Sequence, residues 1–384
     1  MDRLINQLPF FNPEHQNLAQ TVAQFVAGEI EPCAAESEED VERAARHFVS
    51  LLASTGILKF AVAETKLDIR ALCLIREALA YSSSLADLAF VMQGLGTYAI
   101  SQAAPDHVRE FWLSRAANGK AIAAFALTEP EAGSDVAAIQ TTARRDGETY
   151  VIDGRKRFIS NAGIADFYTV FAKTGTREDG RAALSAFVVG SKMQGFSVAQ
   201  RTPLMAPHPI GEIAFNGCRV PAEDMVGNEG DGFKLAMETL DTFRASVGAA
   251  ACGMARRALD EAVSYASARK QFGRFLAEHQ LVQAKLADMV TELDAARLLV
   301  YRAAYAKDTG TSRVTREASE AKLFATEAAG RIIDSAVQIH GGTGLVSGTV
   351  VERLYRDVRA LRIYEGTSEI QKLVIAGQLL KEAN

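Results

Sequence analysis

Residues 362–371, RIYEGTSEIQ, place the carboxylate of Glu365 between an aromatic side chain, Tyr364, and a glycine, Gly366. The residues that follow predict a helix, so Glu365 stands at the foot of that helix in an apolar setting. A carboxylate held in such a place suits proton transfer to or from a bound ligand. The alternative is an acid in the first turn that only stabilises the helix dipole, so the rest of the chain must decide between them.

A polar turn follows an apolar strand in FALTEPEAGSD, residues 125–135. Pro130, Gly133 and Ser134 bend the chain there. Such a turn can direct backbone amides and hydroxyls at the carbonyl or phosphate oxygens of a ligand. Taken alone, it is equally an ordinary turn.

A second strand end lies in RFISNAG, residues 157–163. Phe158 could lie against a planar ring, and Ser160 could hydrogen-bond the edge of that ring. The simpler interpretation makes Phe158 an ordinary core residue.

Two further stretches lie where predicted helices end. In ARKQFGRFLAEHQ, residues 268–280, the guanidinium of Arg269 could clamp a pyrophosphate or merely complement a helix C-terminus. In AVQIHGGTG, residues 336–344, Gly341 and Gly342 end a helix and allow another backbone to come close.

The periods of the sequence predict three segments that position these residues. Residues 1–120 read as helical, with Asn12 and Pro13 as a helix start. Residues 121–225 read as a small antiparallel β-domain, in which Asp146-Gly147 and Asp153-Gly154 are hairpin signals. Residues 226–384 carry four amphipathic stripes, which predict a four-helix bundle. The fold class is therefore mostly α with a β insert.

Composition excludes several classes of protein. The 384 residues carry 42 Lys and Arg against 47 Asp and Glu, a net charge of −5 without a basic run, so we expect no nucleic-acid partner. Neither a signal peptide nor a membrane span is expected, which favours a cytoplasmic protein. The four cysteines form no CxxC, the six histidines lack ligand spacing, and no metal site is expected. His208, in a proline-rich stretch, is expected to be a loop residue rather than a catalyst.

Together and in this order, the motifs resemble the acyl-CoA dehydrogenase family, from about residue 15 to the end. The matching stretches are TEPEAGSD, FISNAG, RVP at residues 219–221, RKQFG, EHQ, QIHGG and YRDVRALRIYEGTSEIQ. The resemblance implies a tightly bound FAD between the β-domain and the bundle. Phe158 stands where many relatives have tryptophan, and either ring could cover the flavin.

The resemblance also assigns site residues. Those expected to bind FAD are Phe125, Ala126, Leu127, Thr128, Gly133, Ser134, Phe158, Ile159, Ser160, Arg269, Phe272, Gln280, Gln338, Ile339, His340, Gly341, Gly342, Thr367, Ser368 and Glu369. Those expected near the acyl-CoA are Ser134, Leu240, Asp241, Phe243, Arg244, Tyr364 and Gly366. In such enzymes the matches to Arg269, Phe272, Gln280 and 338–342 reach the cofactor of a neighbouring subunit, so a homotetramer built as a dimer of dimers is implied. Ser368 to Gln371 also fits a capping box.

Glu365 matches the catalytic base of much of the family. Its expected role is to remove the Cα proton of an acyl-CoA thioester while a hydride passes from Cβ to FAD. We expect burial to outweigh the helix dipole at Glu365 once substrate displaces water. Phe243 is bulkier than the residues common at its position and could shorten the acyl pocket. It also cannot serve as the base that some relatives place on that helix.

Three functions stay open at this point. The leading one is an acyl-CoA dehydrogenase of fatty acid or carboxylic acid catabolism that passes electrons to an electron-transfer flavoprotein. The second is an acyl-CoA oxidase, whose reduced flavin reacts with oxygen. The third is a flavin-binding relative without dehydrogenase activity. The acyl group itself is not identified by the sequence.

Overall fold

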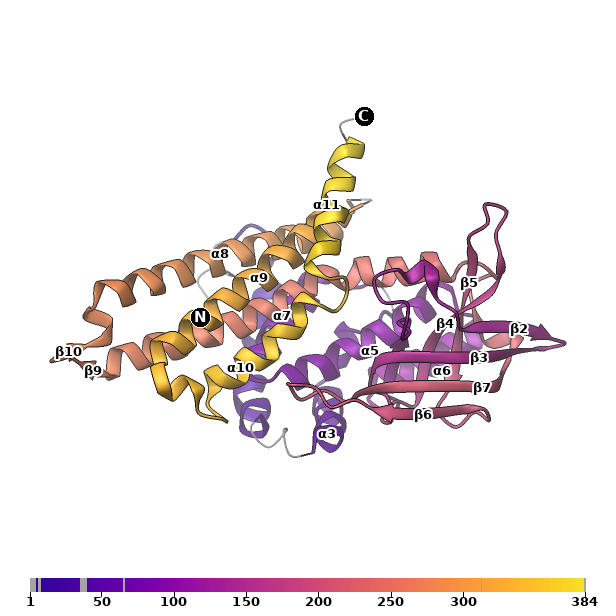
Figure 1. Cartoon of the computed structure of the whole chain (residues 1–384), viewed down its shortest axis with the longest axis horizontal. Helices are drawn as coiled ribbons and strands as arrows, with labels where there is room; N and C mark the ends of the chain where they lie inside the picture. Colours follow the sequence, from indigo (N-terminus) through magenta and orange to yellow (C-terminus); the bar gives the residue numbers. More distant parts are fainter. Residues whose placement is uncertain (1–4, 6–7, 35–39, 65, 312, 383–384) are drawn as a thin grey trace. The chain divides into compact units, whose positions relative to one another are not determined.

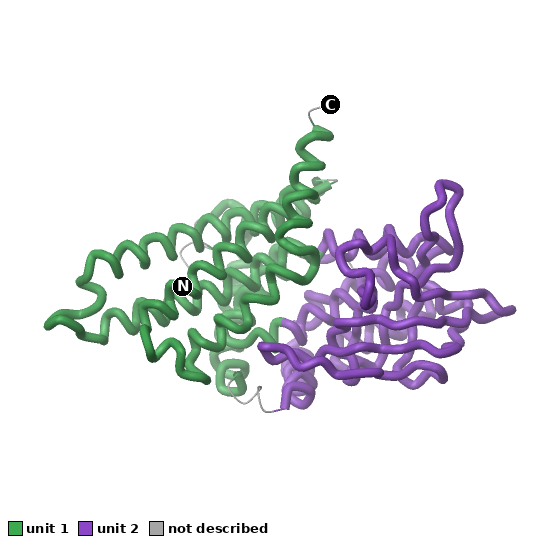
Figure 2. Tube along the Cα trace, viewed as in Figure 1, with its two compact units in different colours: residues 1–36, 68–87, 243–384 green, residues 37–67, 88–242 purple. Residues whose placement is uncertain are grey.

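The computed structural model describes residue 5 and residues 8–34, 40–64, 66–311 and 313–382. The chain divides into two compact units, which Figure 2 colours separately. Unit 1 comprises residues 1–36, 68–87 and 243–384, and unit 2 comprises residues 37–67 and 88–242. The predicted division at residues 120 and 225 into three domains stays a prediction.

Helices make up both ends of the chain and strands its middle (Figure 1), which confirms the predicted fold class. The α-helices are α2 (Pro13–Phe25), α3 (Val41–Ser54), α4 (Ile69–Ser82), α5 (Ser84–Ala103), α6 (Asp106–Ala117), α7 (Gly232–Ala268), α8 (Gln280–Asp308), α9 (Thr315–His340), α10 (Val350–Val358) and α11 (Ser368–Glu382). The strands are β1 (Ala123–Ala126), β2 (Thr142–Asp146), β3 (Thr149–Ser160), β4 (Phe167–Thr176), β5 (Ala182–Gly190), β6 (Phe196–Arg201), β7 (Ile210–Pro221), β8 (Met225–Val226), β9 (Lys270–Gln271) and β10 (Arg274–Phe275). Short 3-10 or π turns are η1 (Val26–Ile30), η2 (Glu31–Cys33), η4 (Ile57–Phe60), η5 (Val136–Ala138), η6 (Ala222–Asp224), η7 (Leu276–Glu278), η8 (Gly341–Leu345) and η9 (Arg359–Arg362).

Small residues bring the helices of unit 1 close together. Half of the buried residues of α9 are alanine, including Ala321, Ala325 and Ala328. On α7, Gly253 lies against α4 so closely that a Cβ there would stand 2.1 Å from the carbonyl oxygen of Glu77. The short α10, which the sequence did not predict, packs against α9.

The sheet of unit 2 has the strand order β6-β7-β3-β2-β4-β5-β8, and β1 also pairs with β4. It is mainly antiparallel, as expected, but β1 runs parallel to β4, and β2 pairs with β4 in parallel at Thr142 and Lys173. Buried residues of β1, β4 and β5 form one core with residues of α5 and α6. The hydroxyl of Thr169 on β4 donates to the carbonyl of Gly96 on α5, which fixes the helix against the strand.

Only one of the two predicted Asp-Gly hairpins is a hairpin. Asp146 ends β2 and pairs with Thr149 of β3, and Gly147, at φ +62°, and Glu148 form the two-residue loop between them. The prediction for Asp153-Gly154 is wrong, because β3 continues through it. Gly154, at φ +146°, instead forms an irregularity in the pairing with β7, and a Cβ there would meet Thr141 at 2.6 Å. The signal at this position therefore reports a close backbone approach rather than a turn.

The start of α2 was also predicted from the sequence. Asn12 caps α2 through its side chain, and Pro13 occupies the first turn, as predicted. Within the described part of the chain, no helix is long and apolar enough to cross a membrane.

Candidate active site

The predicted acid lies in a turn of unusual backbone conformation. After α10 and η9, the chain forms a turn in which Glu365 has φ +53° and Gly366 has φ +90°, and α11 begins at Ser368. A left-handed conformation is rare for a residue with a side chain, so surrounding contacts must hold it. The predicted helix just after Glu365 is confirmed.

Two buried side chains hold the backbone of this turn. The Lys322 ammonium on α9 donates to the carbonyl oxygen of Gly366 at 2.7 Å. From α11, the Gln371 amide donates to the same oxygen at 3.1 Å and to the carbonyl oxygen of Glu365 at 3.3 Å. Lys322 and Gln371 are both 0% exposed. The two side chains therefore constrain consecutive left-handed residues from two different helices.

The Glu365 carboxyl group lies in a desolvated, charged environment. Its Oε2 atom is buried and has no hydrogen-bond partner among the described residues. Burial raises the pKa of Glu365, and Asp87 adds to the rise, while the positive charges of Arg76, Lys322 and Arg244 oppose it. The effect of burial on the pKa of Glu365 exceeds the opposing effect of the positive charges, as expected from the sequence. The protein by itself produces this rise, whereas the sequence-based expectation required bound substrate. The Glu365 carboxyl group thus combines a raised pKa with a buried oxygen that has no partner among the described residues.

A buried ion pair stands next to the predicted base. The guanidinium of Arg76 donates to both carboxylate oxygens of Asp87, at 2.8 and 2.7 Å, and to the hydroxyl of Ser246 at 2.9 Å. Burial disfavours the charge of Arg76, but Asp87 outweighs burial and raises the pKa of Arg76. Burial also raises the pKa of Tyr364, which stays protonated.

The predicted capping box at the start of α11 is wrong. The Ser368 hydroxyl donates instead to Glu327 at 2.6 Å, and Gln371 is used to hold the Glu365 turn. The cap is Thr367, whose hydroxyl oxygen accepts from the backbone N–H of Ile370 at 3.3 Å. Both side chains of the predicted box therefore bond elsewhere, Ser368 to α9 and Gln371 to the preceding turn.

In unit 2 the two strand ends singled out in the sequence lie side by side. The backbone N–H of Arg157 donates to the carbonyl of Thr128 at 2.9 Å, and the Asn161 amide donates to the carbonyl of Ala123 at 2.9 Å. A buried Lys156 completes the connection, donating to the carbonyl of Leu127 at 3.0 Å and to Glu129 at 2.8 Å. Segment 125–128 and segment 158–160 are thereby fixed as one surface.

Phe158 is not the core residue that the simpler interpretation assumed. Phe158 has φ +55°, and 49% of its surface is exposed to solvent. The guanidinium of Arg157 lies 5.0 Å from the centroid of its ring. The pairing of β3 with β7 is irregular at this point, which turns the ring outward. An exposed aromatic plane in a strained backbone is suited to cover a planar ligand.

Ser160, two residues further on, has an unexpected partner. Its hydroxyl is 2.8 Å from Nε2 of His208. Burial lowers the pKa of His208 to about 4, so its imidazole is neutral. His208 is a loop residue, as expected, but it supports a predicted ligand contact. Nearby, Gly133 and Ser134 are exposed on the turn that follows β1.

A separate group in unit 1 comprises the predicted cofactor residues Arg269, Phe272, Gln280 and 338–342, whereas Thr367, Ser368 and Glu369 lie at the start of α11. Phe272, at φ +54° and 96% exposed, forms the tip of the β9–β10 hairpin, which Arg269 precedes and Gln280 follows. The segment Gln338–Gly342 ends α9 beside this hairpin's base, because His340 stacks on Tyr265 at 4.3 Å. Figure 1 shows the hairpin at the opposite end of α7 and α8 from the start of α11. One chain therefore does not bring this group to Glu365.

The predicted acyl-CoA residues fall on both sides of the unit boundary on α7. Leu240 and Asp241 belong to unit 2, whereas Phe243 and Arg244 belong to unit 1. Phe243 is 0% exposed, and Arg244 is buried and acts electrostatically on Glu365.

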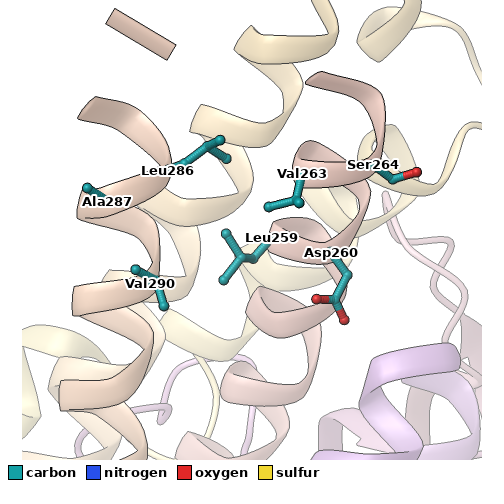
Figure 3. A pocket seen from close by; sticks show the side chains of 7 residues that line it. All are labelled: Leu259, Asp260, Val263, Ser264, Leu286, Ala287 and Val290. Carbon is teal, nitrogen blue, oxygen red and sulfur yellow. The ribbon is translucent and has the colours of Figure 1, made fainter. Parts of the chain in front are cut away.

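A groove elsewhere in unit 1 is distinct from these residues. It lies between α7 and α8, has a volume of about 540 Å³, and contains none of the predicted site residues (Figure 3). Its lining residues are Leu259, Asp260, Val263, Ser264, Leu286, Ala287 and Val290.

Sequence reasoning missed several residues around Glu365. Arg76 was detectable as a charge inside the apolar run LCLIREALA, and Lys322 as a charge beside the alanine stripe of its helix. Asp87 lies in a mostly apolar helix and could have been noticed for the same reason. No local pattern indicates that these residues meet at Glu365.

Comparisons with known proteins identify the family of the chain. Family models of acyl-CoA dehydrogenases match the N-terminal domain at residues 12–120, the middle domain at 124–218 and the C-terminal domain at 230–380. The chain is 41% identical over 380 residues to a 3-(aryl)acrylate reductase of Clostridium sporogenes, covering 97% of this chain and 100% of that protein. It is 44% identical over 275 residues to the caffeyl-CoA reductase–Etf complex subunit CarC of Acetobacterium woodii, covering 71% and 72% of the two chains. The structure of an acyl-CoA dehydrogenase complexed with FAD from Bacillus anthracis superposes with a TM-score of 0.90 at 30% identity, covering 99% of this chain and 70% of that one.

Proposed function

Because this chain belongs to the acyl-CoA dehydrogenase family of FAD-dependent oxidoreductases, we propose that it interconverts an acyl-CoA and its 2-enoyl-CoA with Glu365 as the proton-transferring base. The observation that carries this proposal is the Oε2 atom of Glu365, which is buried without a hydrogen-bond partner among the described residues. A buried carboxyl oxygen left in this way normally has a functional explanation.

In the forward direction, the Glu365 carboxylate takes the proton from Cα of the thioester. Bound FAD supplies the other half of the chemistry by accepting a hydride from Cβ. The raised pKa of Glu365 brings the base closer to the weakly acidic carbon, and the surrounding cations keep its carboxylate form accessible. In the reverse direction, the protonated Glu365 returns its proton to Cα, which is the same step read backwards.

The turn that carries Glu365 offers a second contribution. The backbone N–H of Glu365 donates to no other described residue. We assign it as a donor to the thioester carbonyl oxygen, where negative charge develops as the Cα proton leaves. A donor aimed at such a developing charge typically contributes a factor of about 10² to 10³ in rate. The clamps from Lys322 and Gln371 keep this N–H and the carboxyl group in a fixed relation.

The residues of unit 2 fit a flavin. Phe158 offers a half-exposed ring to lie along the isoalloxazine, and Ser160 offers a hydroxyl to its edge. Backbone groups of Phe125 to Thr128, held by Lys156, and the exposed turn at Gly133 and Ser134 would complete the contact. Thr367 to Glu369, at the N-terminus of α11, would hold the nucleotide part, because a helix N-terminus favours phosphate.

The hairpin group would serve the cofactor of a second copy. Arg269, Phe272, Gln280 and the segment Gln338–Gly342 lie at the end of the helices remote from Glu365, and Phe272 is almost fully exposed. These positions support a dimeric site within the proposed tetramer. Light scattering of the purified protein tests this, and a monomer that still binds FAD normally would contradict it.

The substrate and the electron partner belong to the same proposal. Two similar proteins are named as reductases of an aryl acrylate and of caffeyl-CoA. These names favour an aromatic acyl group and make reduction of the 2-enoyl double bond a second candidate function. An electron-transfer flavoprotein is the proposed partner, because one of these relatives is a subunit of an Etf complex. Titration of the bound flavin with butyryl-CoA, 3-phenylpropionyl-CoA and their enoyl forms ranks the substrates. Hydrogen peroxide formed at the turnover rate would point to an oxidase instead.

Glu365→Gln tests the assignment of the base. The variant keeps the shape of the side chain and should retain FAD and acyl-CoA binding, but flavin reduction should slow by at least about 100-fold, since a positioned base contributes about that much. The matched control is Glu178→Gln, the same chemical change at an exposed turn between β4 and β5, which should leave the rate unchanged. Bleaching of the Glu365→Gln flavin at a near-normal rate would reject the role. A flavin that no acyl-CoA bleaches in the wild type would favour a non-enzymatic relative.

A further inference from the structure

Lys322 is a fully buried cation beneath the turn that carries Glu365. It is 0% exposed, and its ammonium donates to the carbonyl oxygen of Gly366 at 2.7 Å. Burying an ammonium group in a protein interior is unfavourable unless charged or strongly polar groups compensate it. The position of Lys322 therefore needs an explanation that its helix alone does not supply.

The contact with Gly366 acts on the geometry of the turn. Glu365 and Gly366 are consecutive left-handed residues, at φ +53° and φ +90°. This conformation is strained for Glu365, which has a side chain, but not for Gly366, so contacts with the carbonyl groups of the turn stabilise it at Glu365. Gln371 provides the second hold, because its amide reaches both carbonyl oxygens of the turn. Of the side chains of Lys322 and Gln371, only that of Lys322 also carries a charge.

The charge of Lys322 acts on the carboxyl group of Glu365. The charged groups that face Lys322 are Glu365, Arg244, Glu327 and Glu369. Burial lowers the pKa of Lys322 to about 8, against the attraction of Glu365. Lys322 in turn opposes the rise that burial causes in the pKa of Glu365. The two groups are thus coupled, each favouring the charged form of the other.

We propose that Lys322 is the positioning residue of the base: its ammonium fixes the Gly366 carbonyl, and its charge favours the carboxylate form of Glu365. This inference rests on the proposed function, because it takes Glu365 to be the base. It gives the buried lysine two tasks that a neutral hydrogen-bond donor performs only in part. At mildly alkaline pH, Lys322 loses its proton, and its positive charge no longer favours the carboxylate form of Glu365.

Variants at Lys322 separate these tasks. Lys322→Met removes both the donor and the charge, Lys322→Gln retains a donor without the charge, and Lys322→Arg retains both. The matched control is Lys285→Met, the same change on the exposed face of α8. Each holoenzyme is compared for FAD content and for the rate of flavin reduction by a saturating acyl-CoA from mildly acidic to mildly alkaline pH.

The expected result is a shift of the acidic limb of the pH–rate profile. Loss of an opposite charge near a carboxyl group raises its pKa by about one unit or more, so Lys322→Met and Lys322→Gln should move the limb to higher pH. At a pH on that limb, the rate should fall by about tenfold. Lys322→Arg should restore the wild-type limb. A wild-type profile in Lys322→Met with normal FAD content would overturn the proposal.

A second readout measures protonation of Glu365 without turnover. The infrared C=O band of the protonated carboxyl group is identified as the difference between the wild type and Glu365→Gln. Its titration should move to higher pH in Lys322→Gln, the variant that keeps a hydrogen-bond donor if Lys322→Met does not fold. An unchanged band titration would overturn the proposal. Failure of the proposed function looks different, because then Glu365→Gln itself would reduce flavin normally.

Discussion

Removing the charge of one partner from the buried ion pair of Arg76 and Asp87 should lower the free energy of unfolding by several kilocalories per mole. The side chains are 1% and 5% exposed, and two hydrogen bonds of 2.7 and 2.8 Å join them. Asp87→Asn keeps the shape of the side chain but leaves the guanidinium buried without its counter-charge. Breaking a buried ion pair in this way costs about 3 to 5 kcal/mol, and we expect a loss in that range.

Removing both charges should cost much less. In Arg76→Met/Asp87→Leu, no uncompensated ion is left, and such apolar replacements are often neutral or stabilising. Ser246, which loses its contact with Arg76, still donates to the carbonyl of Phe243. We therefore expect the double variant to recover most of the stability. Glu238→Gln is the control at an exposed pair, that of Lys234 with Glu238, and should lose no more than about 0.5 kcal/mol.

The measurement is urea unfolding followed by circular dichroism, at equal FAD saturation for all variants. The reasoning is refuted if Asp87→Asn loses less than about 1 kcal/mol, since that is the range of exposed pairs. A double variant as unstable as the single one would equally contradict it. The kinetics offer a second check, because the negative charge of Asp87 raises the pKa of Glu365. Asp87→Asn should therefore move the acidic limb of the pH–rate profile to lower pH.

Two more predictions concern close packing and the second buried pair. Gly253→Ala should destabilise unit 1 by about 1 to 3 kcal/mol, because the new Cβ would stand 2.1 Å from the carbonyl oxygen of Glu77. Urea unfolding measures this loss. Unchanged stability would mean that α4 and α7 can move apart at no cost, which would contradict the prediction. Lys156→Met should weaken FAD binding, measured by flavin release, because Lys156 holds both the Leu127 carbonyl and Glu129. Burial lowers the pKa of Lys156 from 10.5 to about 8. Between these two pH values the unfolded chain binds a proton that the folded protein does not, so the stability of the wild type should rise with pH relative to the variant. A fall in relative stability between these pH values would contradict the assignment.

Local signals in the sequence were reliable where the structure depends on neighbours in the chain. Asn12 and Pro13 start α2, Asp146-Gly147 marks a hairpin whose two-residue loop is Gly147-Glu148, and a helix follows Glu365. Each of these depends on the conformational preferences of a few adjacent residues. The helical and β segments, and the motifs that carry the family resemblance, were likewise readable along the chain. The identity of the candidate base came from one such motif.

Predictions from local sequence signals were wrong where a residue from another part of the chain determines how the signal residue is used. Gly154 reads as a hairpin glycine, yet it is needed because Thr141 presses against it. Ser368 reads as a helix cap, yet Glu327 takes its hydroxyl. In both cases the residue type was informative, but the cause of its use lay on another element.

What the sequence determined by itself was the order of helical and β segments, the family and the acid at position 365. What only the tertiary structure decided was the environment of that acid: the ion pair of Arg76 and Asp87, the buried Lys322, and the amide of Gln371. These groups come from different helices, and nothing in their spacing along the chain indicates that they meet. Desolvation and Coulomb interactions depend on distances through space, so the pKa of the candidate base is a property of the fold rather than of the motif.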